Sequence, residues 1–121
     1  MKTHKDLEVW KKGIELVTVV YQVTKSFPKE EIYGLTNQIR RAAVSVPSNI
    51  AEGSARASQK ELIQFLHIAL GSLAELETQF IIARNLEYIK PEEDESIDSR
   101  ISGLIRMLSS FIKNRRQMMD R

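Results

Sequence analysis

Apolar residues recur along the chain at the three- and four-residue steps of an α-helix, in four separate stretches. The first stretch carries two apolar stripes within residues 7–27 and predicts one amphipathic helix over about residues 4–26. Thr3 followed by Asp6 resembles a capping box at its start, and Pro28 is expected to close it. The two stripes are Leu7, Trp10, Ile14, Val17, Tyr21 and Leu16, Val20, Val23, Phe27.

The second stretch follows Pro28, which can open a helix because the first turn of a helix leaves that amide without a partner anyway. Its apolar positions run from Leu35 to Val46. Pro47 lies inside the stretch and is expected to kink or break the helix, because proline removes a backbone hydrogen bond and crowds the preceding turn. Gly53 is expected to end the helix in a left-handed conformation.

The third and fourth stretches have the most regular spacing. Ser58 followed by Glu61 forms a capping box, so a helix is expected to start there. Its four-three seam runs over residues 62–83. Pro91 and the acidic residues after it mark the start of the fourth helix, whose seam runs over residues 97–111. The third seam is Leu62, Leu66, Ala69, Leu73, Leu76, Phe80 and Ala83, and the fourth is Ile97, Ile101, Leu104, Leu108 and Phe111.

Short connections join these helices, so consecutive helices are expected to be antiparallel. The sequence therefore predicts an all-α fold, an up-and-down antiparallel four-helix bundle with the second helix kinked at Pro47. Residues 1–121 are expected to form a single four-helix-bundle domain, because the length matches the commonest domain size and 42% of the residues are hydrophobic.

The apolar surface exceeds what one bundle seam needs. The first helix has two stripes, and the third carries apolar residues outside its seam. Two interpretations stay open: wide core faces that pack at the bundle edge, or an interface between subunits, because monomers rarely expose large apolar patches. The additional residues of the third helix are Ile63, Phe65, Leu70, Ile81 and Ile82.

The net charge is only +2, but basic residues gather in two groups that are candidates for nucleic-acid binding. The alternative is a solvated surface, with a favourable helix-dipole interaction for the carboxy-terminal group. Aromatic residues interleaved with the basic ones, as in single-strand binders, are missing from the sequence. The first group is Arg40, Arg41, Arg56 and Lys60, and the second is Lys113, Arg115, Arg116 and Arg121.

A polar cluster follows helical spacing through Pro47 and consists of Ser45, Ser48, Asn49 and Glu52. Such side chains commonly satisfy backbone groups that a proline leaves free. We therefore favour a structural network over a ligand site.

Chemistry-bearing constellations are sparse, so no catalytic site, metal site or cofactor is predicted. The chain has no Cys, and its two His residues are His4 and His67. A di-metal bundle needs Glu three residues before His, and Gln64 takes that place before His67. The apolar runs are interrupted by charge and no signal-peptide core is present, so no membrane span and a cytoplasmic location are expected. No small-molecule substrate is identified.

Three stretches form a recognisable signature: residues 6–10, residues 35–53 with the run Pro-Ser-Asn-Ile-Ala-Glu-Gly, and residues 71–78. Together they resemble the four helix bundle proteins encoded in intervening sequences of bacterial 23S ribosomal RNA genes. The resemblance implies four helices, assembly into a cyclic homopentamer, no established enzymatic activity and a suspected link to nucleic acid. It also favours the subunit interface over the wide core.

The leading hypothesis is therefore a non-enzymatic oligomeric protein that binds RNA or other nucleic acid through phosphate contacts of its basic patches. The rival is a protein-binding adaptor or scaffold without a nucleic-acid role. An enzyme is disfavoured because no catalytic constellation is present.

Overall fold

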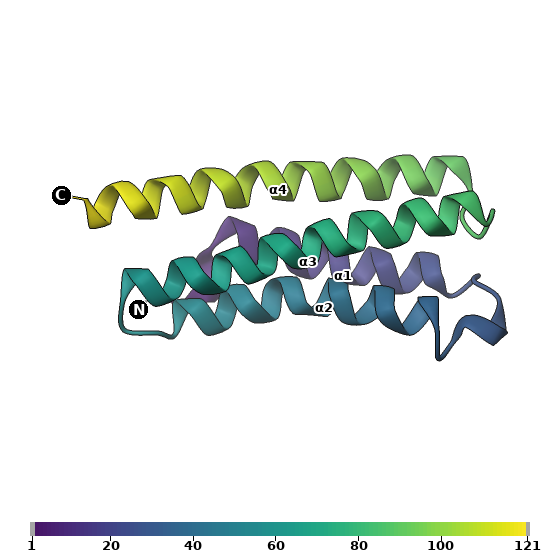
Figure 1. Ribbon diagram of the computed structural model, residues 1–121, viewed down its shortest axis with the longest axis horizontal. Helices are drawn as coiled ribbons and strands as arrows, with labels where there is room; N and C mark the ends of the chain where they lie inside the picture. Colours follow the sequence, from purple (N-terminus) through teal and green to yellow (C-terminus); the bar gives the residue numbers. More distant parts are fainter. Residues whose placement is uncertain (1, 121) are drawn as a thin grey trace.

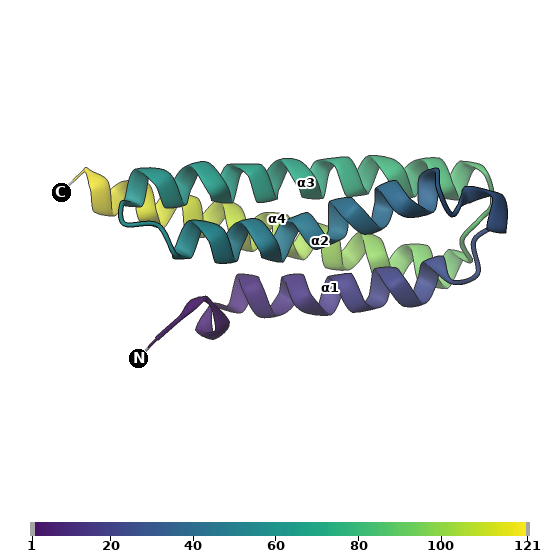
Figure 2. The same ribbon diagram turned by 90° about the horizontal axis from the view of Figure 1, so that it is seen from below.

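The computed structural model describes residues 2–120 as four long helices packed side by side (Figure 1). Helix α1 contacts α2 and α4, and α3 also contacts α2 and α4, so the four helices surround one core. Each helix is antiparallel to its neighbours in both views (Figure 2). The predicted all-α antiparallel bundle is confirmed. The helices are α1 Glu8–Thr24, α2 Leu35–Ser54, α3 Gln59–Asn85 and α4 Pro91–Met119, with short 3-10 helices η1 His4–Asp6 and η2 Lys29–Glu31.

All four helices contribute to the core, and the seams of α3 and α4 are its most regular parts. Every residue of the predicted α3 seam is buried except Leu62, which is partly buried against the core. The α4 seam ends on Ile112, while Phe111 is only partly buried. Burial of these seams is the main favourable term in folding, since each fully buried large aliphatic side chain contributes about 1.5–3 kcal/mol.

The two stripes of α1 have different surroundings. The stripe from Leu16 to Phe27 is buried in the core. The other stripe lies at the edge of the bundle, where Ile14 and Tyr21 remain 41% and 40% exposed. The additional residues of α3 divide in the same way, because Ile63 is buried whereas others stay half-buried or exposed. A wide core face thus accounts for only part of the surplus apolar surface.

The start of α1 differs from the prediction. Thr3 and Asp6 form the expected capping box, with the Thr3 amide donating to Asp6 Oδ2 over 2.9 Å. This capping box caps the start of the 3-10 turn η1 and not of α1, because Leu7 has an extended backbone and α1 begins at Glu8. The predicted helix over residues 4–26 is therefore too long at both ends.

The start of α2 also differs. Pro28 opens only η2, and α2 begins at Leu35. Glu31 holds the turn between them, because its Oε1 accepts from the Leu35 amide over 3.2 Å and its Oε2 accepts from the Tyr88 hydroxyl over 2.9 Å. The bond to Glu31 raises the pKa of Tyr88. A Cβ on Gly34 would lie 2.8 Å from Glu31 Oε1, so glycine fits this turn.

Helix α2 runs without interruption through Pro47 and beyond Gly53. The predicted break is wrong, and the kink stays a prediction. Pro47 is buried, and a Cβ on Gly13 would lie 3.3 Å from Pro47 Cβ, so α1 and α2 approach closely there. Gly53 does not adopt the left-handed conformation expected of it. It lies against α3, where a Cβ would be 2.7 Å from Phe65 Cβ.

Helix α3 begins as predicted, with the Ser58 hydroxyl accepting from the Glu61 amide over 3.2 Å. By length and composition alone α3 could cross a membrane, which corrects the expectation that charge interrupts every apolar run too early. Core helices of soluble proteins meet the same criterion, and the α3 seam is the centre of this core.

Substitution of Gly53 by alanine tests the close packing of α2 on α3. Its Cβ would meet Phe65 Cβ at 2.7 Å, and a backbone shift is needed to relieve the contact. We expect Gly53→Ala to lower the free energy of unfolding by about 1–3 kcal/mol, measured by denaturant titration with circular dichroism.

Gly71→Ala is the matched control, because a Cβ on Gly71 would meet nothing within 4 Å. Alanine there should raise the free energy of unfolding by about 0.5–1 kcal/mol through helix propensity. Equal effects of the two substitutions would contradict the close α2–α3 packing.

Candidate nucleic-acid interface

The fold redistributes the two predicted basic groups. Arg56 and Lys60 lie at the turn between α2 and α3, at the same end of the bundle as the carboxy terminus of α4 (Figure 1). Arg40 and Arg41 lie in the first half of α2, about 24 Å from Arg56 along a helix that rises about 1.5 Å per residue. The first group is therefore not one patch. Its Lys60 joins the carboxy-terminal group instead.

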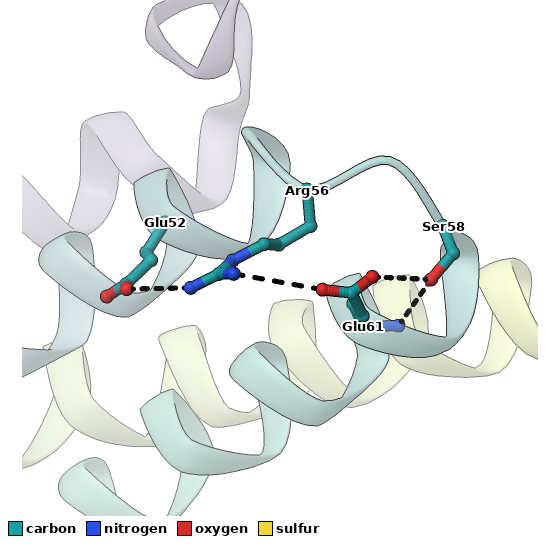
Figure 3. A network of polar contacts seen from close by, with 4 residues as sticks. All are labelled: Glu52, Arg56, Ser58 and Glu61. Atoms are coloured by element: carbon teal, nitrogen blue, oxygen red, sulfur yellow. Dashed lines mark hydrogen bonds and ion pairs between the residues drawn. The ribbon is translucent and has the colours of Figure 1, made fainter.

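Arg56 is occupied by contacts within the subunit (Figure 3). Its guanidinium forms ion pairs with Glu52 over 3.1 Å and Glu61 over 3.9 Å, and it packs over the Phe65 ring at 4.9 Å. Glu61 is also held by the Ser58 hydroxyl over 3.3 Å, so the network ties the α2–α3 turn to the start of α3. Two carboxylates offset the charge of Arg56, and its role as a nucleic-acid ligand stays a prediction.

Arg40 is half-buried between α1 and α2 and not on the open surface. Its Nε donates to Thr24 Oγ1 over 2.9 Å, and its guanidinium lies 4.6 Å from the centre of the Tyr21 ring. These contacts link the two helices. Its neighbour Arg41 is exposed, as predicted, and forms no ion pair within residues 2–120.

Lys60, His67, Lys113 and Arg116 meet where the first turns of α3 face the last turns of α4, and we call this set the basic end. Two adjoining grooves of about 420 and 400 Å³ share His67 and Arg116; Lys60 lines the first and Lys113 the second. Asp120 lines both grooves and is the acidic residue in each. Lys60 and Lys113 are exposed and form no ion pair in the described part of the chain.

Within the basic end, Arg116 Nη2 contacts His67 Nε2 over 2.9 Å. A guanidinium has only donors, so the imidazole nitrogen accepts. Arg115 points elsewhere: its guanidinium packs 4.9 Å from the Phe111 ring centre and donates to Met118 Sδ over 3.4 Å. Arg115 is thus half-buried against its own helix. Arg121 lies outside the described residues.

The opposite end of the bundle is acidic. Glu87, Asp94, Glu95 and Asp98 line a groove of about 540 Å³ at the α3–α4 turn, with Arg84 as its basic residue. Arg84 Nη1 pairs with Asp94 Oδ2 over 3.4 Å. A groove rich in carboxylates and the basic end therefore lie at opposite ends of the molecule.

The predicted polar cluster is only partly assembled. Asn49 Nδ2 donates to the Ser45 carbonyl over 2.8 Å and to Ser45 Oγ over 2.9 Å. Ser45 Oγ in turn contacts Ser72 Oγ of α3 over 2.8 Å, so the network joins two helices. Ser48 is exposed, and Glu52 pairs with Arg56 instead. Ser72 was not predicted as a member of this cluster, because a serine beside an apolar seam carries no distinctive sequence signal.

Aromatic residues do lie beside arginines, which the sequence order concealed. Tyr21 of α1 and Tyr33 of the turn before α2 line one groove of about 590 Å³ with Arg40 and Arg41. Tyr33 is 93% exposed. The expectation that aromatics are missing from the basic patches is therefore wrong for this part of the surface.

Within residues 2–120, no three His, Asp or Glu side chains are arranged to hold a metal ion. The predictions of no metal, no cofactor and no catalytic site stay predictions.

The chain is similar to known proteins in both sequence and fold. The model of a protein family described as 23S rRNA-intervening sequence protein matches residues 5–110. A solved crystal structure of a protein of unknown function from the S23 ribosomal protein family of Bacteroides thetaiotaomicron VPI-5482 is similar, with a TM-score of 0.81 and 28% identity. The similarity covers 87% of this chain and 98% of that one. No curated protein matches. The chain therefore belongs to the 23S rRNA intervening sequence protein family.

Proposed function

We propose that this chain is a non-catalytic, self-assembling protein of the cytoplasm that binds RNA or other nucleic acid through phosphate contacts at its basic end. The observation that carries the proposal is the meeting of Lys60 with Lys113 and Arg116 around adjoining grooves. These residues are far apart in the sequence, so the fold alone brings the charges together.

Helix stability does not explain why a lysine occupies position 60. It lies in the first turn of α3, where the partial positive charge of the helix dipole disfavours a lysine. Lys113 and Arg116 lie near the opposite end of α4, where the dipole favours them, but neither needs Lys60 for that. A phosphate backbone would instead favour all three, because each contact releases condensed counterions.

Self-assembly is supported by exposed apolar side chains on the outer face of α3, which we define by Ile68, Ile82 and the C-cap residue Leu86. They follow helical spacing along one side of the helix, with Glu75 between Ile68 and Ile82, and are 51%, 43% and 50% exposed. A subunit interface would remove them from water. Five copies are the expectation from the family resemblance, and repetition of the basic end around a ring would concentrate its charge.

Charge reversal at the basic end tests phosphate binding. We expect the parent to bind a short RNA duplex with an affinity that falls with salt, with a logarithmic slope of about 0.7–0.9 per phosphate neutralised. The double variant Lys60→Glu with Lys113→Glu should bind weakly and with a shallower slope, measured by fluorescence anisotropy over a salt series. Arg41 is a better surface probe than Arg40 for a further variant, because Arg40 supports the α1–α2 contact.

Lys90→Glu with Arg106→Glu is the matched control. It makes the same change in net charge at exposed residues away from both grooves, so its binding should resemble that of the parent apart from a small long-range effect. No binding by the parent at low salt, or equal losses in both double variants, would favour the protein-adaptor function instead.

Substitution on the outer face of α3 tests self-assembly. Light scattering should give the parent a multiple of the 13.9 kDa subunit mass. Ile68→Glu with Ile82→Glu should reduce that mass while the far-ultraviolet circular dichroism stays helical, because both side chains are exposed in the subunit. Ile14→Glu makes the same type of change on α1 and should leave the mass unaltered. A monomeric parent would contradict the proposal.

A further inference from the structure

The groove between α1 and α2 combines two features that the basic end lacks, an exposed aromatic ring and a lining free of carboxylates. We call it the tyrosine–arginine groove, defined by Tyr21, Tyr33, Asn37, Arg40 and Arg41. Its volume of about 590 Å³ lies within the range of small-ligand sites. Among the residues that line it, both charged ones are arginines.

The backbone turn that carries Tyr33 is anchored, although the Tyr33 ring itself is exposed. The turn that carries it is anchored on both sides by Glu31, through the Leu35 amide and the Tyr88 hydroxyl. The centre of the Phe27 ring lies 5.6 Å from that of the Tyr88 ring, an apolar contact to the residue that binds Glu31. A 93% exposed ring on an anchored backbone is a ready stacking surface, because little backbone entropy is lost when a flat partner binds.

Arg40 is preorganised as well. Its Nε is bonded to Thr24, and its guanidinium lies over one face of Tyr21, so the side chain is fixed before a ligand arrives. The Nε bond uses one of the five N–H donors of a guanidinium and leaves the Nη donors for an anion. Arg41, the next residue, is exposed and adds a second positive charge to the same groove.

The chemistry of the groove selects among occupants. Two arginines without a carboxylate favour an anion, and the Tyr33 ring favours a flat partner. An acidic peptide supplies charge without flat rings. A nucleic-acid duplex supplies phosphates but keeps its bases stacked inside the helix. A single strand supplies both, because its unpaired bases can turn outward onto aromatic side chains while its phosphates meet arginines.

We propose that the tyrosine–arginine groove binds an unpaired segment of nucleic acid, with one base stacked on Tyr33 and neighbouring phosphates at Arg40 and Arg41. This inference rests on the proposed nucleic-acid binding and adds a preference for single-stranded segments. The basic end contacts phosphates of any strand, whereas the groove requires a free base. The two sites therefore respond to different probes.

The test compares three RNA probes by fluorescence anisotropy: a single strand of about 12 nucleotides, a duplex of the same length, and an abasic strand that keeps the phosphates. Tyr33→Ala should weaken binding of the single strand by about fivefold to 150-fold, the loss of one stacked base. Binding of the duplex and of the abasic strand should not change. Tyr33→Phe keeps the ring and should bind the single strand like the parent.

Each of the following outcomes would overturn the proposal for the groove. If the parent binds none of the probes, both the proposed function and the groove are overturned. If the parent binds RNA but Tyr33→Ala binds the single strand equally well, the groove alone is overturned and the basic end stands. If Tyr33→Ala lowers the mass in light scattering and weakens all probes alike, a second copy of the chain covers the groove and the inference fails. Thermal unfolding of Tyr33→Ala should match the parent, since the ring is exposed.

Discussion

The close approach of α2 to α3 determines where the charged groups of this protein can meet. Gly53 lies so near Phe65 that a Cβ would not fit, and the Ser45 and Ser72 hydroxyls bond across the same interface. These contacts set the register of the two helices through a turn of only a few residues. Helix α4 then returns along α3, and this packing places the end of α4 beside Lys60.

The helices that the sequence predicted best are those in which local and tertiary preferences agree. The four-three seams of α3 and α4 face one core, and Ser58 caps α3 through its own hydroxyl. The starts of α1 and α2 were predicted less well, because Thr3 and Pro28 satisfy short-range rules that a 3-10 turn also satisfies. Spacing alone does not reveal where such a turn gives way to an α-helix.

The candidate site was predicted by residue type but not by arrangement. Arg40 and Arg56 were identified as basic, yet their partners Thr24, Tyr21 and Glu61 come from other elements and cannot be foreseen from helical periodicity. Tyr33 precedes Arg40 and Arg41 closely in the chain, but only the fold of the turn before α2 places it in the same groove. Sequence order hides an aromatic platform whenever the aromatic residue and the cation belong to different elements.

The separation of charge between the two ends also acts before any contact forms. Glu87, Asp94, Glu95 and Asp98 surround a groove at one end of the bundle, and the basic end lies at the other. A polyanion approaching such a molecule exerts a torque on it, repelling the acidic end and drawing the basic end forward. The subunit is thereby oriented during diffusion, so the field raises the rate of productive encounters, and salt diminishes that rate by screening the torque.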